Sequence, residues 1–315
     1  MAIKTLTNNE KATDNFGILS VSELPTKAGG TYLDLTLSDK EHNTYEAVKV
    51  WNSTKDQFKA DKGMVIEAQI LAKEYKGKIG YEIINYKVVD LPISEYVHSS
   101  KYDPENLYRM TMLMLNGMED TGLKSLTIRI YEKYHDKIVT WSAAKSMHHD
   151  YKGGLIEHVC RMILHAQMTT KIYPGLNEEL LLCATALHDI GKLDELDTDE
   201  LGASEYTVPG TLLGHPFIGA QIIEREFKEL HPEKDPSEIL PLIHCVIAHS
   251  GNMEWGAIAK PAMAEAYALW LIDMFDSRMK MCEEALDGLQ PGEMSASVCK
   301  GLSSYIYKAP SRNQG

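Results

Sequence analysis

The spacing of apolar residues changes once along this chain, near residue 100, and this change restricts the fold more than any other feature of the sequence. Between residues 16 and 90, apolar and polar residues alternate in short runs, which is the period of half-buried β-strands. From residue 107 onward, apolar residues recur every three or four positions, which is the period of amphipathic helices. The 315 residues are enough for two cores. We therefore predict a multidomain protein, all-β first and all-α second.

Five short runs in the first part are predicted to be strands. They are residues 17–21, 31–37, 45–51, 64–70 and 80–86. Turn residues such as Gly29-Gly30 separate them, and residues 1–15 are expected to be a polar lead-in. Five strands with tight turns are typical of a small barrel, for which the OB-fold is the five-stranded candidate. We expect an OB-fold-like domain over residues 1–95, followed by a helical linker region over residues 96–145.

Aromatic residues and lysines are interleaved in the predicted barrel. Exposed aromatic rings stack on bases and lysines bind phosphates, so this combination indicates single-stranded nucleic acid as a partner. The candidate binding residues are Tyr32, Lys49, Trp51, Lys76 and Lys78. Aromatic residues on strands also commonly pack against their neighbours, so a purely structural role for each of them stays open.

An adjacent histidine–aspartate pair lies at the end of an apolar helical run in the second half. The run 180–187 leads into His188 and Asp189, and Gly191 follows as a residue that ends helices. An imidazole nitrogen and a carboxylate oxygen presented side by side can hold one metal ion. Because the dipeptide alone is common by chance, its interpretation depends on the residues around it. The acidic segment 194–200 is expected to be a solvated loop.

Further histidines and aspartates fall on or at the ends of the helices predicted around this pair. Together the candidate metal ligands are His158, His188, Asp189, His215, His249 and Asp273. Asp273 lies inside the apolar run 269–275, where an unpaired buried carboxylate would be costly. A metal ion or a basic partner would remove that cost. The secondary candidates are His149, His244 and Asp276, the last either as a ligand or as an acceptor for a ligating histidine.

Composition limits the classes of function. A net charge of −13 argues against a wide basic surface for duplex DNA. The sequence has neither a long apolar run nor an apolar leader, so we expect no membrane span and no secretion. The 5 scattered cysteines fit reduced thiols, and we expect a cytoplasmic protein without a membrane partner. Assembly into a homo-oligomer stays open.

Several motifs resemble those of the YhaM-type 3′→5′ exoribonucleases, which are HD-domain phosphohydrolases. His158, His188-Asp189 and Asp273 are similar to the H…HD…D signature of HD domains. The longer matching segments are residues 153–158, 187–192, 212–215, 248–251 and 271–276. In that family an OB-fold precedes the HD domain, and residues 303–308 resemble the family's tail. The resemblance therefore covers nearly the whole chain.

The resemblance implies an activity and a cofactor. The HD domain, expected over residues 146–315, would hydrolyse phosphodiester bonds of single-stranded RNA from the 3′ end with metal-activated water. Single-stranded DNA stays open as a further substrate, and the OB-fold would hold the upstream strand. The implied cofactor is one or two divalent ions. The mixed ligands favour Mn²⁺, with Mg²⁺, Co²⁺ or Fe²⁺ as alternatives.

The resemblance also implies roles for individual residues. The first ion would be held by His158, His188, Asp189 and Asp273. Asp189 would bridge to a second ion, held also by His215 and His249. The expected catalytic residues are His188, Asp189 and Lys192. Lys192 would contact the phosphate or, alternatively, offset the dipole at a helix C-terminus.

One departure from the family leaves the second ion open. Ser250 stands where the family usually has a histidine, so His215 or His244 would have to compensate.

Two other functions also stay open. The chain could be an HD-type nucleotide or cyclic-nucleotide phosphohydrolase, or a single-strand nucleic-acid-binding protein without catalysis.

Overall fold

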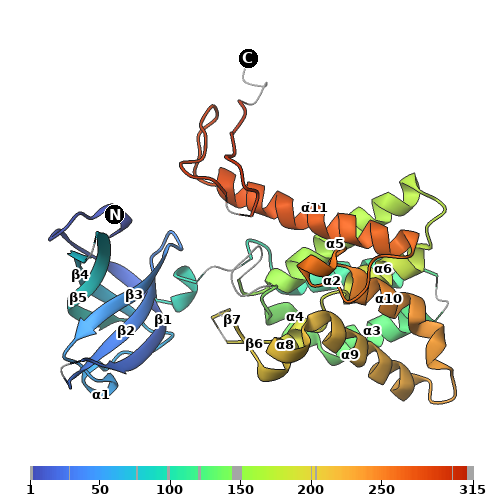
Figure 1. Cartoon of the computed structure of the whole chain (residues 1–315), viewed down its shortest axis with the longest axis horizontal. Coiled ribbons are helices and arrows are strands. Elements are labelled where there is room, and N and C mark those ends of the chain that lie inside the picture. Colours follow the sequence, from blue (N-terminus) through green and yellow to red (C-terminus); the bar gives the residue numbers. More distant parts are fainter. Residues whose placement is uncertain are drawn as a thin grey trace. The chain divides into compact units, whose positions relative to one another are not determined.

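The computed structural model describes residues 3–27, 29–75, 77–97, 100–119, 122–143, 151–199, 201–202, 204–299 and 301–310. The chain divides into two compact units, residues 1–99 and residues 100–315 (Figure 1). The first unit is a β-barrel and the second is helical. The predicted fold class, an all-β domain followed by an all-α domain, is therefore confirmed.

Five strands close the barrel of the first unit. They are β1 (Lys11–Pro25), β2 (Thr31–Ser38), β3 (Thr44–Trp51), β4 (Val65–Tyr75) and β5 (Lys78–Val89). Their order around the barrel is β1-β2-β3-β5-β4, with α1 (Lys55–Phe58) between β3 and β4. All strand pairs are antiparallel except β3 with β5, which pair in parallel at Lys49 and Glu82. This is the five-stranded barrel expected of an OB-fold.

Alternation decides which side chains enter the barrel. In β2, Leu33, Leu35 and Leu37 are fully buried, whereas the residues between them are partly exposed.

The expectation that residues 1–15 form a polar lead-in was wrong both near its start and near its end. Ile3 is buried in the barrel core, and β1 starts at Lys11, which pairs with Leu71. Backbone pairing with β4 holds residues 11–15 in the strand whatever their side chains are.

The second unit is built from helices and one short hairpin. The helices are α2 (Pro104–Asn116), α3 (Leu123–Lys133), α4 (His135–Thr140), α5 (Gly154–Ile172), α6 (Glu178–Leu187), α7 (Lys192–Glu195), α8 (Val208–Leu213), α9 (His215–Leu230), α10 (Leu240–Ala248) and α11 (Ala264–Leu286). The hairpin consists of β6 (Leu196–Thr198) and β7 (Ser204–Tyr206). Among the helices that the structure describes, none is long and apolar enough to cross a membrane.

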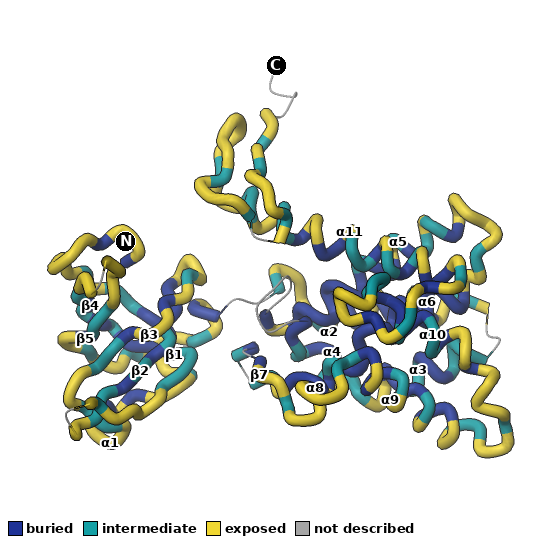
Figure 2. The backbone as a smooth tube through the Cα atoms, viewed as in Figure 1, coloured by how far each residue is buried: buried dark blue, intermediate teal, exposed yellow. Residues whose placement is uncertain are grey.

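Helix α6 lies at the centre of this unit. It packs against α3, α5, α10 and α11, and its residues from Glu179 to Leu187 are all buried (Figure 2). Helices α2 to α4, from the region expected to be a linker, supply part of the same core. Tyr131 of α3, for example, is buried and donates a hydrogen bond from Oη to the carbonyl of Ala186, at 2.8 Å. The end of α6, which carries the His-Asp pair, is therefore held from several sides.

Gly191 should be sensitive to substitution because it packs directly against the first turn of α9. A Cβ at Gly191 would overlap the carbonyl of His215 and crowd the amide of Gly219. We expect Gly191→Ala to destabilise the helical unit by about 1–3 kcal/mol, the usual cost of overpacking. Urea unfolding followed by helical circular dichroism measures this.

Gly175→Ala is the matched control, because nothing lies within 4 Å of a Cβ at that position. Equal unfolding midpoints for the two variants would contradict the proposed close packing of α7 on α9.

Candidate metal centre

The six predicted ligands come from five different places in the helical unit and meet at the end of α6. His158 lies on α5, His188 and Asp189 follow α6, His215 begins α9, His249 ends α10, and Asp273 lies on α11. They form two groups in which one ligand atom of each residue lies within 4.8 Å of the others. The groups are His158, His188 and Asp273, and Asp189, His215 and His249.

The carboxylate of Asp189 lies between the two groups. Its Oδ2 is 3.3 Å from Nε2 of His188, in the first group. Its Oδ1 is 3.4 Å from Nε2 of His215 and 3.9 Å from Nε2 of His249, in the second. A carboxylate with one oxygen toward each group is the arrangement that a bridging ligand requires.

Two of the histidines are oriented by backbone carbonyls. Nδ1 of His188 is 2.8 Å from the carbonyl oxygen of Thr185, and Nδ1 of His249 is 2.6 Å from that of Val246. A carbonyl can only accept, so each Nδ1 carries a proton, and in the neutral ring each Nε2 presents a lone pair to the centre. Metal-ligating histidines are typically held in this way.

The other two histidines are oriented by carboxylates. Nδ1 of His158 is 2.8 Å from Oδ2 of Asp276, and Nδ1 of His215 is 3.1 Å from Oε1 of Glu195. Of the two roles expected for Asp276, the geometry favours the acceptor. The solvated loop expected at 194–200 was wrong for Glu195, which is buried and also accepts the backbone N–H of His215.

Two buried polar atoms at the centre lack hydrogen bonds in the described structure. They are Nε2 of His188 and Oδ1 of Asp189, on side chains that are almost completely inaccessible to solvent. Leaving such a group unsatisfied costs about 1–3 kcal/mol. Both atoms are acceptors directed at the centre, so a cation would satisfy them where a further acceptor would not. The donor set therefore fits a divalent metal ion.

The electrostatics of the centre favour a cation. Burial opposes protonation of His158, but Asp273 and Asp276 outweigh it and raise its pKa to about 10. Burial and the neighbouring imidazoles lower the pKa of His249 to about 4. Burial alone would raise the pKa of Asp189, yet the nearby histidines and lysine hold it well below its usual range. At neutral pH the carboxylate is thus ionised and His249 is neutral, as metal binding requires, whereas His158 has to release a proton when an ion binds.

Lys192 lies beside the carboxylate of Asp189. Its Nζ is 2.7 Å from Oδ2 of Asp189, and burial, which would lower the pKa of the amine, is outweighed by this carboxylate. The alternative role at a helix C-terminus was wrong, because α6 ends at Leu187 and Lys192 is the first residue of α7. Its charge is instead directed into the centre.

A pocket of about 480 Å³ opens onto the ligands. Its lining includes Asp189, Lys192, His215, His249 and Asp273, together with Ser250, Trp255, Trp270, Met274, Ser277, Arg278, Met281 and Gly301. The indole of Trp255 is 59% exposed, and its centroid is 6.4 Å from that of Trp270. Gly251 has φ +73°, and a Cβ there would overlap the ring of Trp270, so glycine is required beneath this ring.

Sequence reasoning missed Trp255, Trp270 and Arg278. Trp255 lies soon after His249 and Trp270 one helical turn before Asp273, and this closeness to candidate ligands was an available signal. The secondary candidate His244 lies in neither ligand group. Its Nε2 accepts the backbone N–H of Ala262, at 2.9 Å. His149 lies outside the described residues.

Three of the five predicted nucleic-acid-binding residues lie together on strands β2 and β3. Tyr32 pairs with Trp51 across the strands, and their ring centroids are 5.0 Å apart. Nζ of Lys49 lies 4.9 Å from the centroid of Tyr32, and this amine also pairs with Asp34. Lys78 is exposed at the start of β5, and Lys76 lies outside the described residues.

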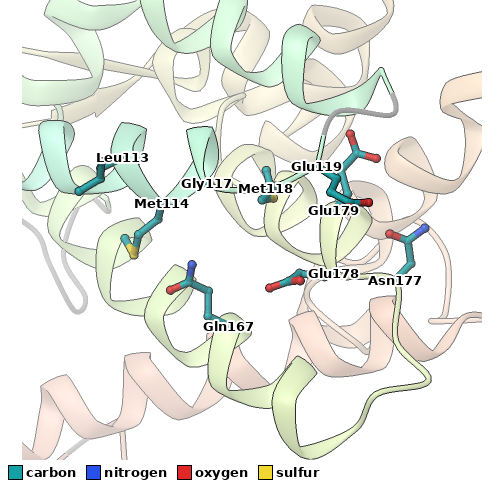
Figure 3. Close-up of a pocket in the computed structure, with 9 residues that line it drawn as sticks. All are labelled: Leu113, Met114, Gly117, Met118, Glu119, Gln167, Asn177, Glu178 and Glu179. Atoms are coloured by element: carbon teal, nitrogen blue, oxygen red, sulfur yellow. The ribbon is translucent and has the colours of Figure 1, made fainter.

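A second hollow, of about 510 Å³, lies at the end of α2 and the start of α6 (Figure 3). Its lining includes the carboxylates of Glu119, Glu178 and Glu179 and the amide of Gln167. The six candidate ligands are not part of this lining. Because glutamates repel phosphates, this hollow does not suit an anionic substrate.

Comparisons with known proteins match both the helical unit and the whole chain. The family model of the HD domain matches residues 155–284. A 3′-5′ exoribonuclease YhaM of Oceanobacillus iheyensis is 31% identical over 305 residues, which is 94% of this chain and 93% of the relative. The protein of the same name from Halalkalibacterium halodurans is 30% identical over 298 residues, 93% of this chain and 91% of the relative.

A solved structure also matches part of the chain. The second OB-fold domain of replication protein A from Methanococcus maripaludis matches 29% of this chain and 95% of its own, with 22% identity and a TM-score of 0.24.

A divalent ion should stabilise the helical unit against heat. An ion that binds only the folded ligands adds about 2.7 kcal/mol at a concentration of 100 times Kd. We expect Mn²⁺ to raise the midpoint of thermal unfolding after prior removal of metal with EDTA, and His188→Ala/Asp189→Ala to lose this gain. Asp194→Asn, a half-exposed neighbour that faces Lys137, is the control that should keep it. Equal gains in all three proteins would contradict a metal site here.

Asp276→Asn should weaken metal binding although it removes no ligand of either group. Asparagine keeps the size of the side chain but loses the charge that orients His158. Loss of such a partner typically costs roughly 10- to 100-fold in affinity. Calorimetric titration with Mn²⁺ measures this, with the exposed Asp287→Asn as control. An affinity within about twofold of the unmodified chain would show that Asp276 does not position the histidine.

Proposed function

The chain belongs to the YhaM family of 3′-5′ exoribonucleases, and from this premise we propose that it removes nucleotides from the 3′ end of single-stranded RNA. The HD domain makes this hydrolysis dependent on a divalent metal. One observation supports the proposal above the others. Six histidine and aspartate side chains, Asp189 among them, converge at a pocket of about 480 Å³, which lies in the range of small-molecule sites and suits one nucleotide.

The ligand set supports Mn²⁺ and two sites. The set combines four imidazoles with two carboxylates, which suits a borderline ion better than Mg²⁺, an ion that prefers an all-oxygen shell. In our proposal the first ion binds His158, His188, Asp189 and Asp273, and the second binds Asp189, His215 and His249. Glu195 would compensate for Ser250, because it holds His215 in the orientation that a ligand needs. Co²⁺ and Fe²⁺ suit the same donors.

In this proposal the residues at the centre have separate roles in phosphodiester hydrolysis. A bound divalent ion supplies Lewis acidity at the phosphate and lowers the pKa of water. The bridging carboxylate of Asp189 keeps the two ligand groups at a fixed separation. Lys192 holds a positive charge beside this carboxylate, where it can offset negative charge that develops on the phosphate. Arg278 adds a second cation to the lining.

The barrel would hold the strand upstream of the scissile bond. Tyr32 and Trp51 offer adjacent rings on which bases stack, and Lys49 provides a charge for the backbone. The face of β2 and β3 is the oligonucleotide-binding face of OB-folds. Stacking does not sense the 2′-hydroxyl, so we propose that the barrel binds single-stranded DNA as well as RNA.

The direct test is degradation of a 5′-labelled single-stranded RNA. We expect a ladder that shortens from the 3′ end with Mn²⁺ and full-length RNA with EDTA or with His188→Ala/Asp189→Ala. Asp194→Asn should degrade as the unmodified chain does. Intact RNA in every lane would overturn the proposal. Hydrolysis of mononucleotides alone would favour a nucleotide phosphohydrolase, and tight binding without any hydrolysis a binding protein.

Trp51→Ala should weaken the binding of long RNA without affecting the chemical step. Base stacking on an aromatic residue is worth about 1–3 kcal/mol, so KM for a long RNA should rise roughly 5- to 150-fold. Hydrolysis of bis(p-nitrophenyl) phosphate, which has no nucleobase to stack on Trp51, should be unchanged.

Val88→Ala, an exposed apolar position on β5, is the control and should leave both substrates unaffected. An unchanged KM for long RNA in Trp51→Ala would exclude this ring from substrate binding.

A further inference from the structure

Helices α5 and α11 carry a row of large apolar side chains on their solvent face. We call these residues the α5–α11 stripe: Leu164, Met168, Ile172, Tyr173, Tyr267, Leu271, Phe275 and Met279. Each is between 41% and 64% exposed. Three members on α5 and four on α11 recur at intervals of four residues, so each helix presents one continuous apolar ridge. The two helices pack side by side in the helical unit (Figure 1).

A groove runs between the two ridges. It has a volume of about 840 Å³, and its lining includes Thr169, Ile172, Tyr267, Leu271 and Phe275. His165 also lines the groove, with its ring centroid 4.9 Å from that of Phe275. The surface thus has both a ridge that can enter a groove and a groove that can receive a ridge.

The stripe is larger than the apolar patches that monomers usually expose. A large side chain has roughly 200 Å² of surface, so eight half-exposed ones expose on the order of 800 Å². The largest patch on a typical monomer covers about 300–600 Å². A standard protein–protein interface buries about 800 Å² on each partner. The stripe alone is therefore large enough for one side of a stable interface.

The charges around the stripe argue against nucleic acid as its occupant. None of its eight members is charged, and Arg161 at one edge is already paired with Glu283 and Asp276. Lys171 is adjacent to Ile172 in the sequence, and Arg278, adjacent to Met279, lines the pocket at the metal centre, whereas a polyanion needs a surface with many more cations. A second copy brings a matching neutral surface, while the rest of a chain with net charge −13 disfavours other contacts between copies.

We propose that two copies of this chain form a two-fold symmetric dimer through the α5–α11 stripe. In such an interface the same patch is used twice, so a surface with both ridge and groove is complementary to itself. Ridges with a spacing of four residues pack into each other's grooves in the commonest class of helix pairs. This proposal does not depend on the proposed nuclease activity.

Sedimentation velocity of the full chain tests the dimer. At 20 µM we expect a mass of about 71 kDa, twice the 35.3 kDa of one chain. Leu271→Glu/Phe275→Glu would bury four carboxylates in the interface and should sediment as a monomer, with an unchanged circular dichroism spectrum. The matched control is Leu113→Glu/Leu212→Glu, at positions that are 74% and 76% exposed on other helices, and it should remain a dimer.

If the charged variant does not fold, Leu271→Gln takes its place in the test. It should raise the Kd of the dimer at least tenfold. A monomeric unmodified chain at 20 µM would overturn the proposal, as would a dimer that persists in the folded Glu variant. A monomer that floats with phosphatidylglycerol vesicles would also overturn it and assign the stripe to a lipid surface.

Discussion

The helical unit depends on one buried carboxylate. Asp189 is ionised with almost no exposure to solvent, a state that is stable only when opposite charge surrounds it. Lys192 supplies one positive charge, and the two groups of candidate ligands surround the carboxylate at a position where a cation would supply more. The helices that carry these groups must therefore have an end near Asp189, as α9 and α10 do, or pass close to it, as α5 and α11 do. This requirement explains why α6 is central and why α9, α10 and α11 pack around its end.

The histidines can act as ligands because other residues hold them. Two rings are held by backbone carbonyls within one turn of their own helices, so they need no other side chain to orient them. The other two need carboxylates from elsewhere, Asp276 for His158 and Glu195 for His215. Each of these carboxylates is buried, and each is stabilised in part by the histidine that it orients. Orientation and burial thus depend on each other at this centre.

Helix α11 connects the metal centre with the surface of the unit. One side of it supplies Asp273 and Trp270 to the pocket, and another side presents Leu271 and Phe275 to solvent. A helix can serve both purposes because residues three or four apart share a side, while residues one apart do not. The barrel has the simpler requirement of alternation along each strand, so Leu33 is buried and Tyr32 is available to a ligand.

The sequence by itself determined the β-then-α order, the five strands and the six candidate ligands, because periodicity and ligand chemistry are properties of short segments. Only the tertiary structure decided which ligands share a group, that Asp189 lies between the groups, and that Asp276 and Glu195 orient histidines. His158 and Asp276 are 118 residues apart, and His215 and Glu195 are 20 apart, so no local pattern relates them. The packing of α2 to α4 into the core and the position of Trp255 beside the ligands were decided in the same way. Contacts between distant segments follow from how the helices pack, and that packing cannot be derived from any one segment.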